Sequence, residues 1–180
     1  IVSGSWDKTV RVWRVADGQL LHTMKGHTNY VSCVRVSPAD GKTVVSGSND
    51  NTLRVWDIER GECVKVLTGH TDRVNSVDIT ADGRTIVSGS NDKTARVWDA
   101  ATGTVRHVLQ HPSSVNAVCA TTMNAQPVVV TGCDDGPVRV WSIDSGALLQ
   151  EFHMHEQMVT GVCATRDGSK IVTSSKDGTL

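Results

Sequence analysis

The chain has 180 residues, of which 38% are hydrophobic, and this is enough for one domain with a sizeable core. Its formal net charge of −1 gives no basic field that would attract nucleic acid or an anionic membrane, so we expect neither as a partner. The five cysteines show no zinc-site spacing, and the chain has no Asn-x-Ser/Thr acceptor. These features predict an intracellular location, cytoplasmic or nuclear, with the cysteines as small buried hydrophobes.

One twelve-residue string recurs along the chain. SGSNDNTLRVWD at 46–57 returns as SGSNDKTARVWD at 88–99, with 10 of 12 positions identical. Weaker copies lie at 3–14 and 131–142, and a fifth begins at 173. The aligned tryptophans are 42 or 43 residues apart, so a repeat of this length organises the chain.

Each repeat has the pattern of four short strands. Residues 73–79 and 85–90 are rich in β-branched side chains and are separated by the hairpin signal Asp82-Gly83. The Trp-containing string follows, and a glycine turn leads to a further apolar segment, as at 62–68. Four such strands cannot bury both faces of their sheet alone, so the units must stack, and radial stacking gives a propeller. The alternation and the turns exclude a helical solenoid.

A second marker recurs out of phase with the tryptophans. It is a Gly-His pair in two repeats and is degraded in two more, at Gly26-His27, Gly69-His70, Gln110-His111 and Met154-His155. Together with the Asp of the SGSxD turn and the Trp-Asp end, it resembles the WD-repeat family over the whole chain. The resemblance implies an all-β propeller of four-stranded antiparallel blades. The fourth repeat departs most, because Ser142 replaces Asp after Trp and Asn124-Ala125 replaces the Asp-Gly hairpin.

The phase of the repeat predicts where blades begin and end. We expect a partial blade at 1–25, complete blades at about 28–67, 71–109 and 112–152, and a partial blade at 156–180. Family propellers close with seven or eight blades. We therefore expect a piece of a larger ring, completed by further blades of the same protein or by a second copy.

Each complete repeat carries a His, a Ser or Thr, an Asp and a Trp. The three quartets are His27, Ser46, Asp50 and Trp56; His70, Ser88, Asp92 and Trp98; and His111, Thr131, Asp135 and Trp141. These residue types could form a catalytic triad. The resemblance implies instead that Trp donates to the hydroxyl, the hydroxyl to His and His to Asp, which ties three strands together. A nucleophile also needs one activated hydroxyl in a cleft, not the same set in every blade. We therefore predict no enzyme activity, no metal and no cofactor.

Two other patterns invite a functional interpretation. His153 and His155 could supply two metal ligands, but no third ligand is evident nearby. An arginine stands two residues before each Trp and could form a basic stripe for nucleic acid. We expect these arginines to have packed aliphatic stems and paired heads, at Arg11, Arg54, Arg96 and Arg139.

The resemblance places a binding surface on the narrow upper face of the ring. Its positions are the residue before the turn Asp and the start of the innermost strand, and the candidates are Trp6, Asn49, Asn91, Asp134, Lys176, Tyr30, Arg73 and Met158. These positions vary between repeats, whereas the interior valines recur. Trp6 differs from its polar counterparts, and an exposed Trp beside Tyr or Arg is typical of a binding hot spot.

We predict a non-catalytic scaffold that binds proteins or peptides on this rim. A second hypothesis is a sensor or autoinhibitory propeller at the end of a larger nucleotide-dependent signalling protein. A third is an enzyme built on the propeller, which would need an unpaired acid, base or metal cluster on the rim.

Overall fold

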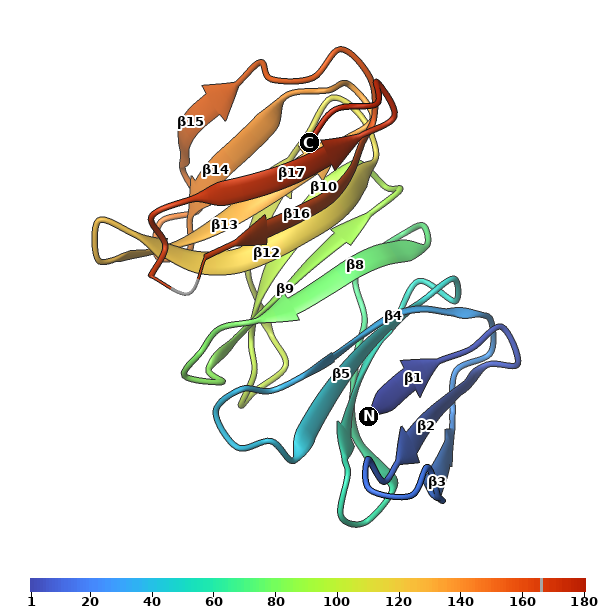
Figure 1. The fold of residues 1–180 in the computed structure, drawn as a ribbon. Coiled ribbons are helices and arrows are strands. Elements are labelled where there is room, and N and C mark those ends of the chain that lie inside the picture. Colours follow the sequence, from blue (N-terminus) through green and yellow to red (C-terminus); the bar gives the residue numbers. More distant parts are fainter. Residues whose placement is uncertain (166) are drawn as a thin grey trace.

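A computed structural model describes residues 1–165 and 167–180, and the regular elements of this part are all β-strands. They form five antiparallel sheets in chain order (Figure 1). The first sheet contains β1 (Val2–Gly4), β2 (Thr9–Trp13) and β3 (Leu20–Lys25), and the second contains β4 (Val31–Val36), β5 (Thr43–Ser48), β6 (Leu53–Asp57) and β7 (Glu62–Leu67). The third contains β8 (Val74–Ile79), β9 (Thr85–Ser90), β10 (Thr94–Asp99) and β11 (Val105–Gln110). The fourth contains β12 (Val115–Met123), β13 (Gln126–Cys133), β14 (Val138–Ser142) and β15 (Leu148–Phe152), and the fifth contains β16 (Val159–Ala164) and β17 (Ile171–Ser175).

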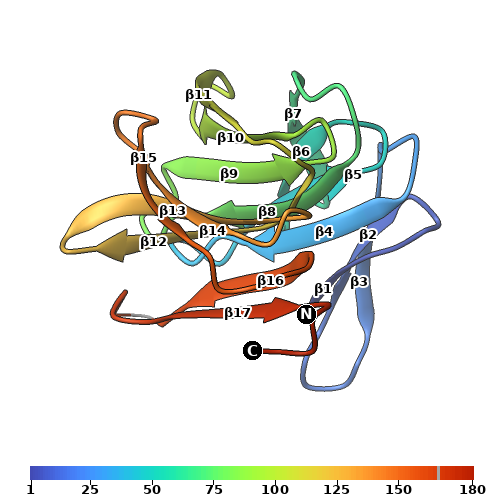
Figure 2. The same ribbon diagram turned by 90° about the horizontal axis from the view of Figure 1, so that it is seen from above.

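The sheets are arranged like blades around a common centre (Figure 2). In the three four-stranded sheets the strand order follows the chain. The first strands β4, β8, β12 and β16 lie next to one another, and the last strands β7, β11 and β15 lie on the outside. In the part of the chain that the structure describes, the blades form an arc that does not close into a ring. The predicted all-β fold of four-stranded antiparallel blades is confirmed.

The hydrophobic core lies between neighbouring blades. One cluster joins Val45, Leu53 and Leu67 of the second blade to Val74 and Trp98 of the third, and all five side chains are buried. Burial of an aliphatic side chain of this size contributes about 1.5–3 kcal/mol. Because each blade covers its neighbour's face, stacking stabilises the fold more than any single blade can.

The glycine of the SGS motif is needed where two blades touch. A Cβ at Gly47 would lie 2.6 Å from Cγ1 of Val74, and one at Gly89 would lie 2.7 Å from Cγ1 of Val115. Both distances are too short for carbon atoms in contact. The first valine of each inner strand therefore packs directly onto the backbone of the preceding blade.

The divergent fourth repeat still forms its hairpin. Asn124 and Ala125 have φ values of 51° and 61°, the left-handed conformation that a two-residue turn of this kind requires. The strands that they join, β12 and β13, are 9 and 8 residues long, against 6 for the corresponding strands of the preceding blades. The hairpin thus forms without glycine, on strands longer than those of the preceding blades.

Candidate protein-binding rim

Two of the predicted quartets form continuous hydrogen-bonded chains. In the third blade, Ser88 Oγ lies 2.8 Å from Trp98 Nε1 and 2.8 Å from His70 Nε2. His70 Nδ1 lies 2.7 Å from Asp92 Oδ2. The second blade repeats this geometry at 2.8 Å for each contact among Trp56, Ser46, His27 and Asp50. Each chain ties the second and third strands of its blade, and the turn between them, to the loop that precedes the first strand.

The protonation of these groups determines which atoms donate. Burial would raise the pKa of Asp92, but hydrogen bonds from Thr94 and His70 outweigh it and hold this pKa below the ordinary value. Burial lowers the pKa of His70, so the ring is neutral near pH 7. The carboxylate can only accept, hence His70 Nδ1 donates to it and His70 Nε2 accepts from Ser88. Ser88 in turn accepts the indole N–H of Trp98.

The third quartet departs from the prediction. His111 Nε2 still lies 2.9 Å from Thr131 Oγ1, and Trp141 Nε1 lies 3.1 Å from the same oxygen. However, His111 Nδ1 donates to the carbonyl of Leu109 at 2.9 Å, and the expected bond to Asp135 is wrong.

Two prolines explain the loss of this bond. In the second and third blades the turn Asp accepts the N–H of the residue after His, and both the N–H and the hydroxyl of the Thr two positions after Asp. In the fourth blade these positions are Pro112 and Pro137, which provide none of the three donors. Asp135 binds Arg139 at 2.7 Å instead.

The partner of the arginine before each tryptophan depends on whether the turn Asp binds His. Arg11 pairs with Asp7, and Arg139 pairs with Asp135 and Glu151. In the second and third blades, where the Asp binds His, the arginine heads of Arg54 and Arg96 pair with no carboxylate of the described residues, so that part of the prediction is wrong. Arg54 and Arg96 lie with their guanidinium carbons 6.0 Å from the ring centroids of Trp56 and Trp98. This is within the range of a cation–π interaction.

The first and fifth sheets contain related hydrogen bonds that the predictions from sequence did not include. In the fifth sheet, His155 lies 2.8 Å from Thr173 and 3.1 Å from Asp177. In the first sheet, Trp13 Nε1 donates to Ser3 at 3.0 Å. Extending the repeat alignment to the partial repeats would have identified both sets. His153 is 76% exposed, whereas His155 is buried, and no group of three or more His, Cys, Asp or Glu side chains in residues 1–165 and 167–180 could hold a metal ion.

The two kinds of rim position are neighbours within each blade. The backbone N–H of the turn residue donates to the carbonyl of the residue before the inner strand, from Asn49 to Tyr30 at 2.9 Å and from Asn91 to Arg73 at 3.1 Å. Asp134 donates in the same way to Ser114, and Lys176 to Met158, at 3.1 and 2.9 Å. Among the candidates, Arg73, Asp134 and Lys176 are exposed, and Asn49, Asn91 and Met158 are half-buried. The rim is thus a row of paired positions.

An aromatic pair connects the first two blades at this rim. The rings of Trp6 and Tyr30 are stacked, with centroids 5.4 Å apart and planes inclined by 16°. Trp6 is 77% exposed and Tyr30 is 43% exposed. The N–H of Val31 donates to the carbonyl of Ser5 at 3.1 Å, which fixes the two loops relative to each other. The pair therefore presents a preorganised aromatic surface to solvent.

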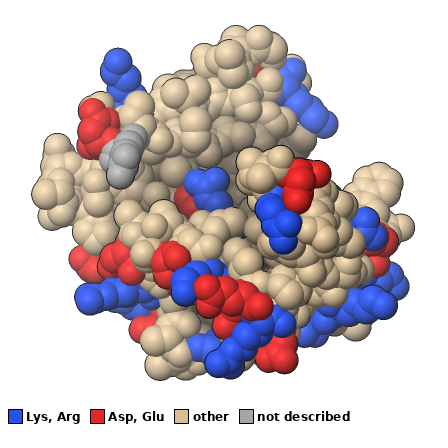
Figure 3. Space-filling model, turned by 60° about the horizontal axis from the view of Figure 1, so that its bottom comes forward, with Lys and Arg blue, Asp and Glu red and all other residues tan. Residues whose placement is uncertain are grey.

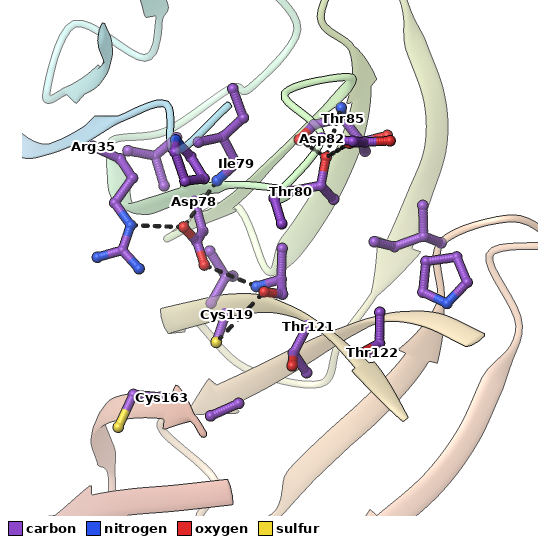
Figure 4. A pocket seen from close by; sticks show the side chains of 18 of the residues that line it. Arg35, Asp78, Ile79, Thr80, Asp82, Thr85, Cys119, Thr121, Thr122 and Cys163 are labelled. Atoms are coloured by element: carbon purple, nitrogen blue, oxygen red, sulfur yellow. Dashed lines mark hydrogen bonds and ion pairs between the residues drawn. The ribbon is translucent and has the colours of Figure 1, made fainter. Parts of the chain in front are cut away.

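A cavity lies at the other end of the inner strands. Its volume is about 1060 Å³, and the ends of β4, β8, β12 and β16 line it (Figure 4). The rim residues lie at or before the starts of these strands, whereas the cavity residues Arg35, Asp78 and Cys163 lie near their ends and Cys119 lies midway along β12. No sequence motif predicted this cavity, because it is assembled from residues of all five sheets.

Stacked four-stranded blades with these hydrogen-bonded chains define repeats of the β-propeller class. Residues 1–14, 18–57, 61–99, 103–142 and 146–180 match the WD40 model, described as WD domain, G-beta repeat. The chain belongs to the WD40 repeat family.

Several known proteins are similar to this chain. It is 33% identical to Autophagy-related protein 16 of Arabidopsis thaliana over 98% of its own length and 26% of that protein. It is 28% identical to Angio-associated migratory cell protein of Homo sapiens, over 98% of its own length and 44% of that protein. Over 38 residues it is 50% identical to Small ribosomal subunit protein RACK1y of Oryza sativa subsp. japonica, covering 21% of this chain and 11% of that protein. The chain thus spans about a quarter or less of the first and third of these relatives. In the described part of the chain, no helix has the length and apolarity needed to cross a membrane.

Proposed function

We propose that the chain is a non-catalytic scaffold that binds proteins or peptides on its upper rim. The observation that carries this proposal is the exposed stack of Trp6 on Tyr30. Trp, Tyr and Arg dominate the binding energy of protein interfaces, and Arg73 lies at the equivalent rim position of the next blade. Because the loops beneath the pair are fixed by backbone hydrogen bonds, a partner would not have to order them.

The quartets support a non-catalytic role. Ser88 and Ser46 are both 0% exposed, and His70 and His27 are buried beside them. Each nitrogen of the His70 ring already has a partner, and the Ser88 oxygen binds both His70 and Trp98. A substrate carbonyl could reach this hydroxyl only after the blade opened. The names of the three relatives mention autophagy, cell migration and the small ribosomal subunit, and none names a reaction.

Surface charge favours a protein partner over nucleic acid. On the face shown in Figure 3, acidic and basic side chains are intermixed, and neither sign forms a continuous patch. Nucleic-acid-binding proteins present a basic stripe to the phosphate backbone. An aromatic pair among polar neighbours is better suited to the side chains of a peptide.

The test is recovery of a partner by pull-down, followed by titration of that partner with variants. Trp6→Ala and Arg73→Ala should each weaken binding by about 1 kcal/mol or more and change stability by less than about 0.5 kcal/mol, since both side chains face solvent. The matched control is Val64→Ala, which truncates an apolar side chain that is 55% exposed on the outer strand β7. Unchanged binding in both rim variants, with loss in Val64→Ala, would move the site to the circumference.

A further inference from the structure

One layer of the inner strands departs from the repeat. The preceding position is valine in all four strands, at Val34, Val77, Val118 and Val162. The next position reads Arg35, Asp78, Cys119 and Cys163, and all four side chains line the cavity of about 1060 Å³. The valine layer packs one blade on the next and keeps one residue type, whereas this layer lines the cavity and does not. This layer is therefore free to serve a purpose other than packing.

Asp78 is a buried carboxylate whose oxygens are occupied. Oδ1 accepts from the backbone N–H of Ile79 at 2.9 Å and from Arg35 Nε at 2.8 Å. Oδ2 accepts from the backbone N–H of Ala120 at 2.9 Å. The carboxylate thus connects β4, β8 and β12 and holds the Arg35 guanidinium by one edge (Figure 4).

The rest of the Arg35 guanidinium is available to a ligand. Its side chain is 57% exposed, and among the described residues only its Nε has a hydrogen-bond partner. Figure 4 shows its terminal nitrogens pointing away from Asp78. Two such nitrogens match the two oxygens of a carboxylate, and a guanidinium that is already oriented loses little freedom on binding.

The remaining lining of the cavity indicates the kind of ligand. Apolar side chains from four strands form much of the wall, among them Val36, Val77, Val118 and Val162. Pockets for small molecules have volumes of roughly 300–1,000 Å³, so this cavity has room for a peptide segment. Arg84 and Arg106 line it together with Asp82 and Asp144, so net charge does not select the ligand. The oriented guanidinium of Arg35 selects the ligand instead.

We propose that this cavity binds a peptide segment in which one acidic side chain is flanked by apolar ones, with its carboxylate on the terminal nitrogens of Arg35. Asp78 acts as the positioning residue for that guanidinium. The site is separate from the rim and does not depend on the rim's function.

Isothermal titration calorimetry with two blocked peptides tests the proposal. Both have Val and Leu on either side of a central residue, which is Glu in one and Gln in the other. The Glu peptide should bind about ten-fold more tightly, because charge-assisted hydrogen bonds are worth at least this factor. Arg35→Gln should reduce the affinity for the Glu peptide about ten-fold and leave that for the Gln peptide unchanged. Arg35→Lys should recover only part of the lost affinity, since an ammonium group lacks the two terminal nitrogens of the guanidinium.

Two control variants distinguish peptide binding at Arg35 from binding elsewhere on the protein. Arg60→Gln removes the same charge from a side chain that is 74% exposed, lies 3.8 Å from Asp57 and does not line the cavity, and it should change affinity less than two-fold. Trp6→Ala should leave binding of the Glu peptide intact. The proposal is overturned if the wild-type protein does not bind the Glu peptide, if Arg35→Gln and Arg60→Gln have equal effects, or if Trp6→Ala abolishes binding. The last result would place the peptide on the rim instead.

Discussion

Replacing Ser88 by alanine removes the central atom of a buried hydrogen-bonded chain. Ser88 Oγ is the shared partner of Trp98 Nε1 and His70 Nε2, both at 2.8 Å, and all three residues are buried. Ser88→Ala leaves the indole N–H without an acceptor and the imidazole nitrogen without a donor. A buried polar group without a partner costs about 1–3 kcal/mol. We therefore expect the free energy of unfolding to fall by about 2–4 kcal/mol.

A double-mutant cycle identifies the origin of this loss. Trp98→Phe removes the indole N–H, so it should cost less in the Ser88→Ala background than in the wild type, and urea unfolding followed by circular dichroism measures all four proteins. Ser145→Ala, at an exposed turn, is the control and should stay within about 0.5 kcal/mol of the wild type. If the two changes are additive, or if Ser88→Ala matches the control, the hydrogen-bonded chain does not stabilise the blade.

The contacts between and within blades give three further predictions. Gly47→Ala should destabilise the protein by about 1–3 kcal/mol in thermal or urea unfolding, because the new methyl group overlaps the next blade. Gly161→Ala is the control and should cost less, because only the movable hydroxyl of a serine lies near its added carbon. Burial lowers the pKa of His111 to about 4 in the folded protein, whereas the imidazole of the unfolded chain takes up a proton near pH 6.5. The unfolded state therefore binds more protons between these values, and the free energy of unfolding should fall by up to about 3 kcal/mol as the pH falls from 6.5 to 4. A His111→Gln variant with an unchanged slope would refute this assignment. Pro137→Thr restores two hydrogen-bond donors to Asp135, so we expect its carboxylate to return to the imidazole of His111 and raise the pKa of that ring in an NMR titration. An unchanged pKa would mean that the proline does not displace Asp135.

The sequence predicted the relations within a blade. The spacing of the repeated string, the hairpin glycines and the β-branched segments determine four antiparallel strands per repeat, because strand pairing and turns depend on residues close together in the chain. The resemblance to the WD-repeat family predicted that His70, Ser88 and Trp98 meet within the blade. The cause of the missing bond between His111 and Asp135 was also present in the sequence, as Pro112 and Pro137. Its consequence could not be predicted, because it depends on which donors hold the Asp135 carboxylate in the folded blade.

Only the tertiary structure determined the relations between blades. The stacking of Trp6 on Tyr30, the contact of Gly47 with Val74 and the ion pair of Arg35 with Asp78 each join residues of different blades. Their geometry depends on how far each blade is rotated and shifted against the next, which the local pattern of one repeat does not specify. The cavity at the end of the inner strands has the same origin, because its wall comes from strands of separate blades and exists only once the blades have packed.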